Sequence, residues 1–386
     1  MFTGFGFAQN NNPELDSLVS KGIANNNNIK AMQLQVDKAK ASIKTAYSID
    51  KTNVYYSYDQ NNLAVNNEPL KVFGVQQSFA FPTVYGAHKK VLQAEYEKEN
   101  SNLNLQKSQL TREISTVYNQ IVFVQHQEKL YNYLDSLYQN FSNASDRRFE
   151  LGESNYLEKI TAQAKFRQIK TKLNQIKKDK IGFYDKLKSL VQTEEKLVIS
   201  STELKAENNL SNTNNKELYN SYYENVTDIY KKQISFQKQQ ALPDLHLEYF
   251  QGKNTGLSSS LYGFQVGVSI PLFYNGNVAK NKVAKIELQS WEAQKENEMF
   301  KIEAHLSQQK QTLEKFQEGI NYYNQYGKKL SEEIIKVADM SYKHGEIDFF
   351  QYIMSLENAT SIQMDYLETL LQYNLTQLNL QYITLE

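Results

Sequence analysis

The chain has 386 residues, with 43 basic and 43 acidic side chains and no cysteine. Balanced charge argues against a nucleic-acid-binding protein held by bulk charge, and the lack of cysteine excludes disulfides, thiolate metal sites and thiol catalysis. Only 15 glycines and 5 prolines predict few turns and long uninterrupted elements. No apolar run approaches the length of a transmembrane helix, but barrel strands leave no such signal, so a membrane location stays open.

The first elements follow a short apolar segment. Residues 1–12 (MFTGFGFAQNNN) lack a basic n-region, and we interpret them as a signal-peptide remnant or as a tail. Pro13 to about Ile49 is predicted to be helical, with a break at a run of asparagines. Thr52–Tyr58 is predicted to be an aromatic-rich strand, and Gln60–Pro69 a polar loop.

One stretch of the chain occurs twice. Phe73–Lys90 (FGVQQSFAFPTVYGAHKK) aligns with Tyr262–Ala279 (YGFQVGVSIPLFYNGNVA) when Pro82 is placed on Pro271. Each copy alternates between apolar and small or amide residues and stops at the proline, which is the pattern of a strand with two different faces. A transmembrane barrel strand of about this length has its apolar face on lipid and its polar face on water.

On that hypothesis two sets of residues take opposite sides of the sheet. The residues predicted to face lipid are Phe79, Phe81, Val268 and Ile270. The residues predicted to face the pore are Gln76, Ser78, Gln265 and Ser269.

The rest of the first half is predicted to be two long helices. No proline or glycine lies between Gly86 and Gly152, which is enough for one helix of ~90 Å. Its apolar residues mostly follow steps of three and four, as in a coiled coil. They are Leu103, Leu105, Leu110, Ile114, Val117, Tyr118, Ile121 and Val124. A second helix returns from Asn155 to about Leu190, and the polar segment Glu194–Asn215 follows it.

The second half repeats the first. It is predicted to contain a helix over Leu218–Gln240, a strand over Leu242–Phe250, a helix from Asn275 to about Tyr342 and a helix over Ile347–Ile383. The helix break repeats as well.

That break aligns RFELGESNYLEKI with SYKHGEIDFFQYI, which places Gly152 on Gly345. The chain is therefore predicted to consist of two tandem repeats, 13–193 and 216–386, joined by a linker segment, 194–215. Four strands cannot close a barrel alone. If these strands span a membrane, several chains must pool them, because an open edge in lipid leaves backbone groups unpaired.

The order, spacing and duplication of these motifs resemble the TolC-type outer membrane efflux proteins over nearly the whole chain. The stretches that carry the resemblance are VGVSIPLFYNGN (Val266–Asn277), QQSFAFPTVYGAH (Gln76–His88), LPDLHLEY (Leu242–Tyr249), RRFELGESNYLEK (Arg147–Lys159) and YKHGEIDFFQYI (Tyr342–Ile353). The sequences FAFPTVYGAHK and RFELGESNYLEKITA look most like those of the Bacteroidota members that work with heavy-metal (Cus/Czc-type) RND transporters.

The resemblance implies a mainly α fold with a β-barrel contribution. Three chains would form a 12-stranded barrel in the bacterial outer membrane and an α-helical barrel across the periplasm, with 194–215 in an equatorial domain. The implied function is the passive exit duct of a tripartite RND-type efflux pump, without enzymatic activity or cofactor. The implied partners are two further copies, a periplasmic adaptor (membrane fusion) protein, an inner-membrane RND transporter and outer membrane lipid.

The resemblance also implies that the two glycine turns are periplasmic tips that meet the adaptor. The tip residues are Leu151, Gly152, Glu153, Ser154, His344, Gly345, Glu346 and Ile347. The glycines by themselves are also typical of left-handed helix caps. The two acidic gate positions of the family fall here on Gln351 and Met354, which is a departure from an aspartate ring. The gate candidates are instead Glu158, Tyr342, Glu346 and Asp348.

Other sites are not indicated. The five histidines lack the spacing of metal ligands, and we predict no bound metal. No nucleophile, phosphate-binding or dinucleotide motif is present in the sequence. The alternative to a channel is a soluble coiled-coil scaffold or adaptor, whose strands would need a partner surface for their apolar side.

Overall fold

The computed structural model describes residues 12–63, 69–207, 216–253 and 259–383. It divides into two compact units. The sheet unit comprises Ala31–Asn104 and Leu218–Met299, and the turn unit comprises Met1–Lys30, Leu105–Glu217 and Phe300–Glu386. Each unit combines segments from both predicted repeats. Among the described residues, no helix is both long enough and apolar enough to cross a membrane.

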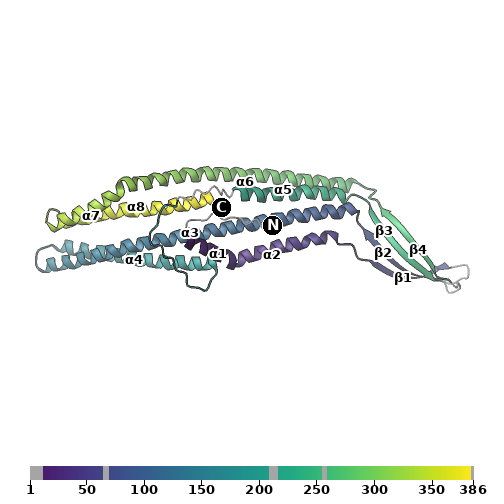
Figure 1. The fold of residues 1–386 in the computed structure, drawn as a ribbon, viewed down its shortest axis with the longest axis horizontal. Helices are drawn as coiled ribbons and strands as arrows, with labels where there is room; N and C mark the ends of the chain where they lie inside the picture. The colour runs from purple at the N-terminus through teal and green to yellow at the C-terminus, as the bar shows by residue number, and fades with distance from the viewer. Residues whose placement is uncertain (1–11, 64–68, 208–215, 254–258, 384–386) are drawn as a thin grey trace. The chain divides into compact units, whose positions relative to one another are not determined.

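The sheet unit is built on one antiparallel sheet. Its strands are β1 (Asn53–Leu63), β2 (Pro69–Phe79), β3 (Asp244–Lys253) and β4 (Leu261–Ser269), in the order β1-β2-β3-β4 (Figure 1). In the described part of the chain, β1 and β4 each pair on one side only. The sheet therefore has two open edges.

The first strand is longer than the sequence pattern predicts, so the expected loop over Gln60–Pro69 is wrong in extent. β1 continues to Leu63, and β2 already begins at Pro69. The register of β1 against β2 shifts between Asp59 and Leu63. The polar run between these two residues has low strand propensity and lies in the irregular part of the ladder, which resumes where Leu63 pairs with Pro69.

Two glycines let aromatic rings lie across the sheet. Gly74 is level with Tyr55 on β1, and a Cβ on Gly74 would collide with the Tyr55 ring. Gly263 on β4 stands in the same relation to Phe250 on β3. Gly74 and Gly263 are equivalent positions of the two repeats, so both copies use glycine for the same close approach.

Helices of the sheet unit include α2 (Asn27–Ser42), which runs into the 3₁₀ turn η1 (Ile43–Tyr47), and α5 (Lys216–Gln239). The long helices α3 (Pro82–Glu150) and α6 (Asn275–Tyr322) begin here. The indole of Trp291 on α6 donates to Thr227 Oγ1 on α5 at 3.0 Å. Two tyrosines of α5, Tyr223 and Tyr230, stack on the same indole.

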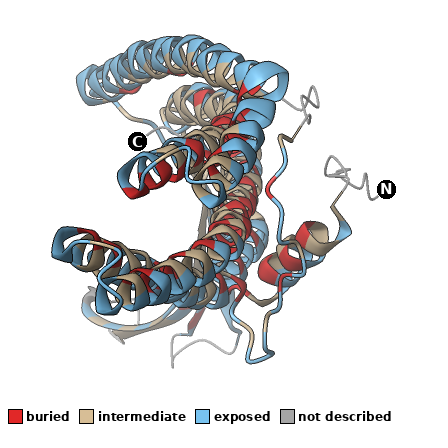
Figure 2. Ribbon diagram, turned by 90° about the vertical axis from the view of Figure 1, so that its left-hand side faces the viewer, coloured by how far each residue is buried: buried red, intermediate tan, exposed pale blue. Residues whose placement is uncertain are grey.

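The turn unit contains α1 (Pro13–Asn25), α4 (Tyr156–Val191), α7 (Lys328–Lys343) and α8 (Phe349–Gln381). Buried positions form stripes along the helices, with exposed positions on the opposite sides (Figure 2). The stripe predicted for α3 is confirmed, since all of its residues except Leu105 are buried. Steps of three and four therefore identify the packing face of this helix correctly.

The helix predicted from Asn275 to Tyr342 is not continuous α-helix. Tyr323–Gly327 forms a π turn, η2, in which the Lys328 N–H donates to the Tyr323 carbonyl. The Tyr323 ring stacks on Tyr366 of α8, with centroids 3.7 Å apart and planes 9° apart. A Cβ on Gly327 would lie 3.0 Å from that same Tyr323 ring. Contacts between α8 and this turn thus stabilise a local change of helix type.

The described part of the predicted linker is held against the helices of the turn unit. Ile199 and Leu204 are buried. Asn374 of α8 accepts a hydrogen bond from the Glu207 N–H at 3.0 Å and donates to Asn119 Oδ1 and to the Lys205 carbonyl, both at 2.9 Å. One buried amide therefore ties this segment to α3 and α8.

Glu207 makes the stability of the turn unit depend on pH. Burial raises the pKa of its carboxyl above the ordinary value of 4.5. The folded state then binds more protons than the unfolded state, so the free energy of unfolding falls as the pH rises above that value. We expect Glu207→Gln to remove this loss, so that its melting temperature exceeds that of the wild type increasingly from pH 5 to pH 8.

Glu203→Gln is the matched control for that measurement. Lys129 donates to Glu203 Oε1 and lowers the pKa of the Glu203 carboxyl. Its contribution is present at neutral pH and is lost as the pH falls, which is the opposite sign. The same pH trend in both variants would contradict the assignment to Glu207.

Candidate functional site

The strand register sorts the side chains of the sheet onto two faces of different chemistry. On the polar face, Gln76 is level with Asn53, Glu248 and Gln265. The full set of polar and charged residues on this face is Asn53, Tyr55, Ser57, Asp59, Gln76, Ser78, Asp244, His246, Glu248, Gln265 and Ser269. The four residues predicted to face a pore all lie on this one face.

The polar face is held by hydrogen bonds that cross the strands. The His246 ring on β3 reaches Ser78 Oγ on β2 through Nδ1 at 2.8 Å and Ser269 Oγ on β4 through Nε2 at 2.5 Å. The Tyr55 hydroxyl of β1 donates to the Glu248 carboxylate of β3. These bonds connect all four strands on the same side of the sheet. The cross-strand hydrogen bonds hold these polar side chains in position although no apolar core encloses them.

The opposite face, called here the apolar face, lies open. Its members are Val54, Tyr56, Tyr58, Lys71, Phe73, Val75, Gln77, Phe79, Leu245, Leu247, Tyr249, Gln251, Lys253, Tyr262, Phe264, Val266 and Val268. Phe264 and Val266 are 78% and 65% exposed. Contiguous exposed apolar surface of this kind marks a contact with another molecule or with lipid.

Two of the predicted lipid-facing residues lie outside the ladder. Phe79 and Val268 are level with each other across β3 and lie on the apolar face. Phe81 and Ile270 lie beyond the ends of β2 and β4, so the register assigns them to neither face. The strands stop short of both residues because the prolines that follow have no N–H for the ladder.

The first glycine turn joins α3 to α4. Gly152 has φ +74°, its N–H bonds to the Phe149 carbonyl at 3.0 Å, and the Glu153 N–H bonds to the Arg148 carbonyl at 2.8 Å. This pair of bonds is a Schellman cap. Asn155 then caps α4, since its side chain accepts the Glu158 N–H at 2.9 Å.

The second glycine turn, between α7 and α8, has the same design. Gly345 has φ +72°, and the bonds run from Gly345 to Tyr342 and from Glu346 to Ser341. Asp348 caps α8 by accepting the Gln351 N–H at 2.8 Å. The Asp348 N–H in turn donates to Gln351 Oε1 at 3.0 Å, which completes a capping box.

Glycine is required at both turns by backbone conformation and not by space, because no atom lies within 4 Å of a Cβ built on Gly152 or Gly345. We expect Gly152→Ala to lower the free energy of unfolding by about 1–2 kcal/mol, and Gly152→Asn to cost less. Thermal or denaturant unfolding measures both variants.

Gly182→Ala provides the control with the opposite expected sign. Gly182 lies within α4, and a Cβ there also meets no atom within 4 Å. Because its backbone is helical, alanine should stabilise the protein there by roughly 0.5–1 kcal/mol. A stabilising effect of Gly152→Ala would exclude the left-handed cap as the reason for glycine.

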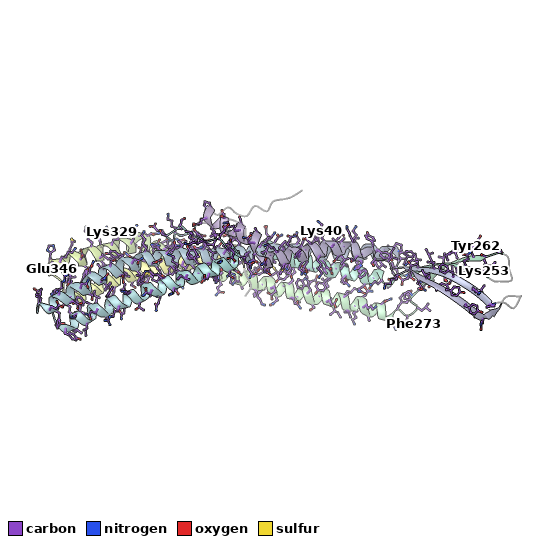
Figure 3. The ribbon with its side chains drawn as sticks, turned by 90° about the horizontal axis from the view of Figure 1, so that it is seen from below. Lys40, Lys253, Tyr262, Phe273, Lys329 and Glu346 are labelled. Carbon is purple, nitrogen blue, oxygen red and sulfur yellow. The ribbon has the colours of Figure 1, made fainter. Side chains whose placement is uncertain are left out.

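The residues predicted as tip contacts are mostly exposed. Leu151 is 72% exposed, and Gly152, Glu153, His344, Gly345 and Glu346 are also exposed. Ser154 and Ile347 are half-buried, and Ile347 packs on a cluster of Ala338, Tyr352 and Leu356. Figure 3 labels Glu346 at the end of its helical hairpin.

The four gate candidates differ in what they contact. Glu158 is buried and accepts a hydrogen bond from Arg148 Nη1 at 3.0 Å. The same Nη1 donates to the Tyr342 hydroxyl at 3.2 Å, so Arg148 joins the α3–α4 hairpin to the α7–α8 hairpin. The carboxylate of Glu346 accepts from Ser341 Oγ, and Asp348 is engaged in its helix cap.

Sequence reasoning missed Arg148, the centre of this link. The alignment of the two turns could have indicated this ion pair. Arg148 lies four residues before Gly152 and Glu158 six residues after it, so the two side chains face each other across the hairpin. Beneath the link, Phe141 of α3 stacks on Phe349 with centroids 4.7 Å apart and also contacts the rings of Tyr342 and Tyr352. An aromatic cluster therefore packs the two hairpins together. Tyr342 belongs both to this cluster and to the Arg148 link, whose ion pair is partly exposed.

No group of three or more histidine, aspartate or glutamate side chains that could hold a metal ion occurs among the residues that the structure describes.

Comparison with solved structures assigns the fold to a class, that of bacterial outer membrane channels. Comparison with models of protein families and with curated proteins gives no match. The structure resembles that of CusC, described for its transmembrane channel formation, with a TM-score of 0.78 and 16% identity over 95% of this chain and 91% of CusC.

Two further channels have the same fold. The CmeC outer membrane channel of Campylobacter jejuni gives a TM-score of 0.77 at 13% identity, over 96% of this chain and 85% of CmeC. The open state of the MtrE outer membrane channel of Neisseria gonorrhoeae gives 0.77 at 13% identity, over 96% of this chain and 88% of MtrE. The likeness covers nearly the whole chain and establishes the fold.

Proposed function

We propose that the chain is the outer membrane exit duct of a tripartite efflux pump and works as a homotrimer. Twelve pooled strands would form a barrel in the outer membrane, and the long helices would line a duct through the periplasm. The observation that carries the proposal is the four-stranded sheet, with one apolar face, one polar face and two open edges, in a chain with the fold of outer membrane channels.

The open edges support association through the sheet. An unpaired strand edge inside a bilayer leaves its N–H and C=O groups without partners, at several kcal/mol each. In a closed ring of copies, β4 of one chain pairs with β1 of the next, and every edge is satisfied. The apolar face then meets lipid, and the polar face lines the lumen.

Cross-linking tests the ring directly, because the natural chain has no cysteine. A chain carrying Ser57→Cys on β1 and Gln265→Cys on β4 is treated with a flexible bis-maleimide in outer membranes. We expect bands of one, two and three chains of 44.8 kDa, with none larger. Either single cysteine variant should give no ladder, since equivalent edges do not meet in a ring.

Other outcomes would refute the proposal. A chain that stays soluble without detergent and runs as a monomer is the scaffold alternative, not a channel. A ladder that continues beyond three chains contradicts the trimer. Cross-linking by a single cysteine variant contradicts pairing of β1 with β4.

We also propose that the glycine turns dock the periplasmic adaptor and that the Arg148 link holds the tips closed. The support is the repeated cap geometry, the exposed residues at both turns and the single guanidinium that bridges two hairpins. Adaptor contact on the turns would separate the hairpins and dilate the end of the duct. An inner-membrane RND transporter supplies the energy in this scheme.

Heavy-metal cations are the substrate class that we propose. The sequence resemblance to the Cus/Czc-type branch supports it, as does the polar face, which contains the three acidic residues of the described strands, Asp59, Asp244 and Glu248. An acidic lining with no metal-binding cluster among the described residues suits a conduit, because a conducted ion must also leave. Loss of the gene product should sensitise cells to copper, zinc or cobalt salts. Sensitivity to bulky organic drugs alone would overturn the assignment.

A further inference from the structure

The charged side chains of the described strands are divided between the two faces by sign. The strands contain three carboxylates and two lysines in addition to His246. All three carboxylates lie on the polar face, whereas Lys71 and Lys253 both lie on the apolar face. The apolar face therefore carries positive charge with no described carboxylate beside it.

The two lysines are direct neighbours. Lys71 on β2 is the register partner of Lys253 on β3, and Tyr58 on β1 completes the same row. Lys71 Nζ lies 5.8 Å from the centroid of the Tyr58 ring. Neither lysine forms an ion pair with a described residue. Like charges directly opposite each other destabilise a strand pair, so this position favours a bound anion that neutralises both.

Successive rows on this face begin with the lysines, continue with two rows that contain most of the aromatic rings, and end with two rows that are aliphatic apart from Gln77 and Phe79. Below the lysine row come Tyr56, Phe73, Gln251 and Tyr262, then Val54, Val75, Tyr249 and Phe264, then Gln77, Leu247 and Val266, and finally Phe79, Leu245 and Val268. Lys253 and Tyr262 lie near the loop end of the sheet, and Phe273 lies toward the end that leads into α6 (Figure 3).

This order matches the depth profile of a membrane interface. Lysine stems extend charged groups to the headgroup level, aromatic rings lie just below it, and aliphatic side chains face the hydrocarbon. Under the proposed function, the end of the sheet that leads into the helices faces the periplasm. The lysine row then lies in the outer leaflet.

We propose that Lys71 and Lys253 bind a phosphate group of a phosphorylated glycolipid in the outer leaflet. Two ammonium groups supply up to six N–H donors to one phosphate and remove their mutual repulsion. The acyl chains of the same lipid would lie along the aromatic and aliphatic rows below. The proposal rests on the proposed function, since that function defines which end of the sheet faces outward.

The test uses native mass spectrometry of the full chain in detergent with bis-phosphorylated lipid A as the probe. The wild type should retain the lipid, and Lys71→Gln/Lys253→Gln should bind it about tenfold more weakly, because each lysine contributes a factor of several near an anionic surface. Lys71→Arg/Lys253→Arg should bind it like the wild type. Lys40→Gln/Lys329→Gln, which removes two exposed lysines outside the sheet, should change nothing.

Two further arms identify the source of the anion. Lipid A without its phosphates should bind the wild type as weakly as the phosphorylated lipid binds Lys71→Gln/Lys253→Gln. Inorganic phosphate at the same concentration should not displace the lipid, because it gains nothing from the apolar rows. Equal binding of both lipids, or unchanged binding by Lys71→Gln/Lys253→Gln, overturns the site. Displacement by inorganic phosphate overturns the lipid assignment.

The same spectra separate this inference from the proposed function. If the wild type and Lys71→Gln/Lys253→Gln both form trimers and bind the lipid equally, only the phosphate site is refuted. A wild type that is monomeric and soluble without detergent refutes the outer membrane duct itself.

Discussion

Val266→Lys is expected to prevent the chain from assembling in the outer membrane. Val266 lies in the middle of β4 on the apolar face, level with Leu247 and Gln77, and is 65% exposed. A lysine on the lipid face near the bilayer midplane costs about 2–4 kcal/mol. The proposed trimer would carry three copies, so the total is roughly 6–12 kcal/mol, comparable to the whole stability of a typical domain. Unheated gel electrophoresis of detergent-extracted outer membranes measures the trimer.

Gln265→Lys is the matched control, because Gln265 is the neighbouring residue on the same strand and lies on the polar face. It introduces the same side chain and the same charge, but into the lumen. We expect normal trimers from this variant and a lower preference for cations in planar bilayers, since the lysine offsets nearby carboxylates. The opposite result, with Gln265→Lys lost and Val266→Lys assembled, would mean that the two faces are reversed.

Arg148→Ala is expected to loosen the closed tip. It removes the donor to Glu158, which is buried, and to the Tyr342 hydroxyl, so a carboxylate loses its partner and the two hairpins lose a link. The Arg148 side chain is 40% exposed, so water screens part of the pair. We therefore expect a loss of about 1–2 kcal/mol. That loss corresponds to an increase of roughly tenfold in the open fraction, measured as the open probability of single channels without the adaptor.

Arg147→Ala tests whether the effect belongs to the link. Arg147 is the adjacent arginine and is exposed. Its backbone carbonyl accepts the Leu151 N–H at the helix end, and its side chain takes no part in the link. We expect the open probability of Arg147→Ala channels to match that of the wild type. Tyr342→Phe, which removes one acceptor of the arginine, should give a smaller increase than Arg148→Ala. Equal effects from both arginine variants would assign the change to net charge at the tip and not to the link.

The faces of the sheet could be predicted from the sequence because strand periodicity is local and the pattern occurs twice. The alternation predicts that Gln76 and Gln265 share a face, and the register places both on the polar face; that this face lines a pore stays a prediction. The end of β1 could not be predicted, because the polar residues after Asp59 lie in a register shift, and the strand continues only because Leu63 pairs with Pro69 of β2.

Features that depend on distant partners were less accessible to sequence reasoning. The π turn at Tyr323–Gly327 depends on a stack with Tyr366 of another helix. The role of Arg148 depends on Glu158 across a turn and on Tyr342 in a different hairpin. Among the gate candidates, Asp348 illustrates the limit, since an acidic residue beside a glycine turn is equally suited to cap the next helix.

The alternation within the strands has a consequence for how such a chain is exported. From Tyr262 to Ser269 of β4, each exposed apolar residue is followed by a small or polar one, as in Phe264, Gln265, Val266 and Gly267. Under the proposed function, the unfolded polypeptide would present these strands to a secretion channel without a long apolar stretch that could halt it in the inner membrane. Its affinity for lipid arises only when neighbouring strands pair and bring the alternate residues to one side. Under the same proposal, the folding step itself would select the membrane into which the protein inserts.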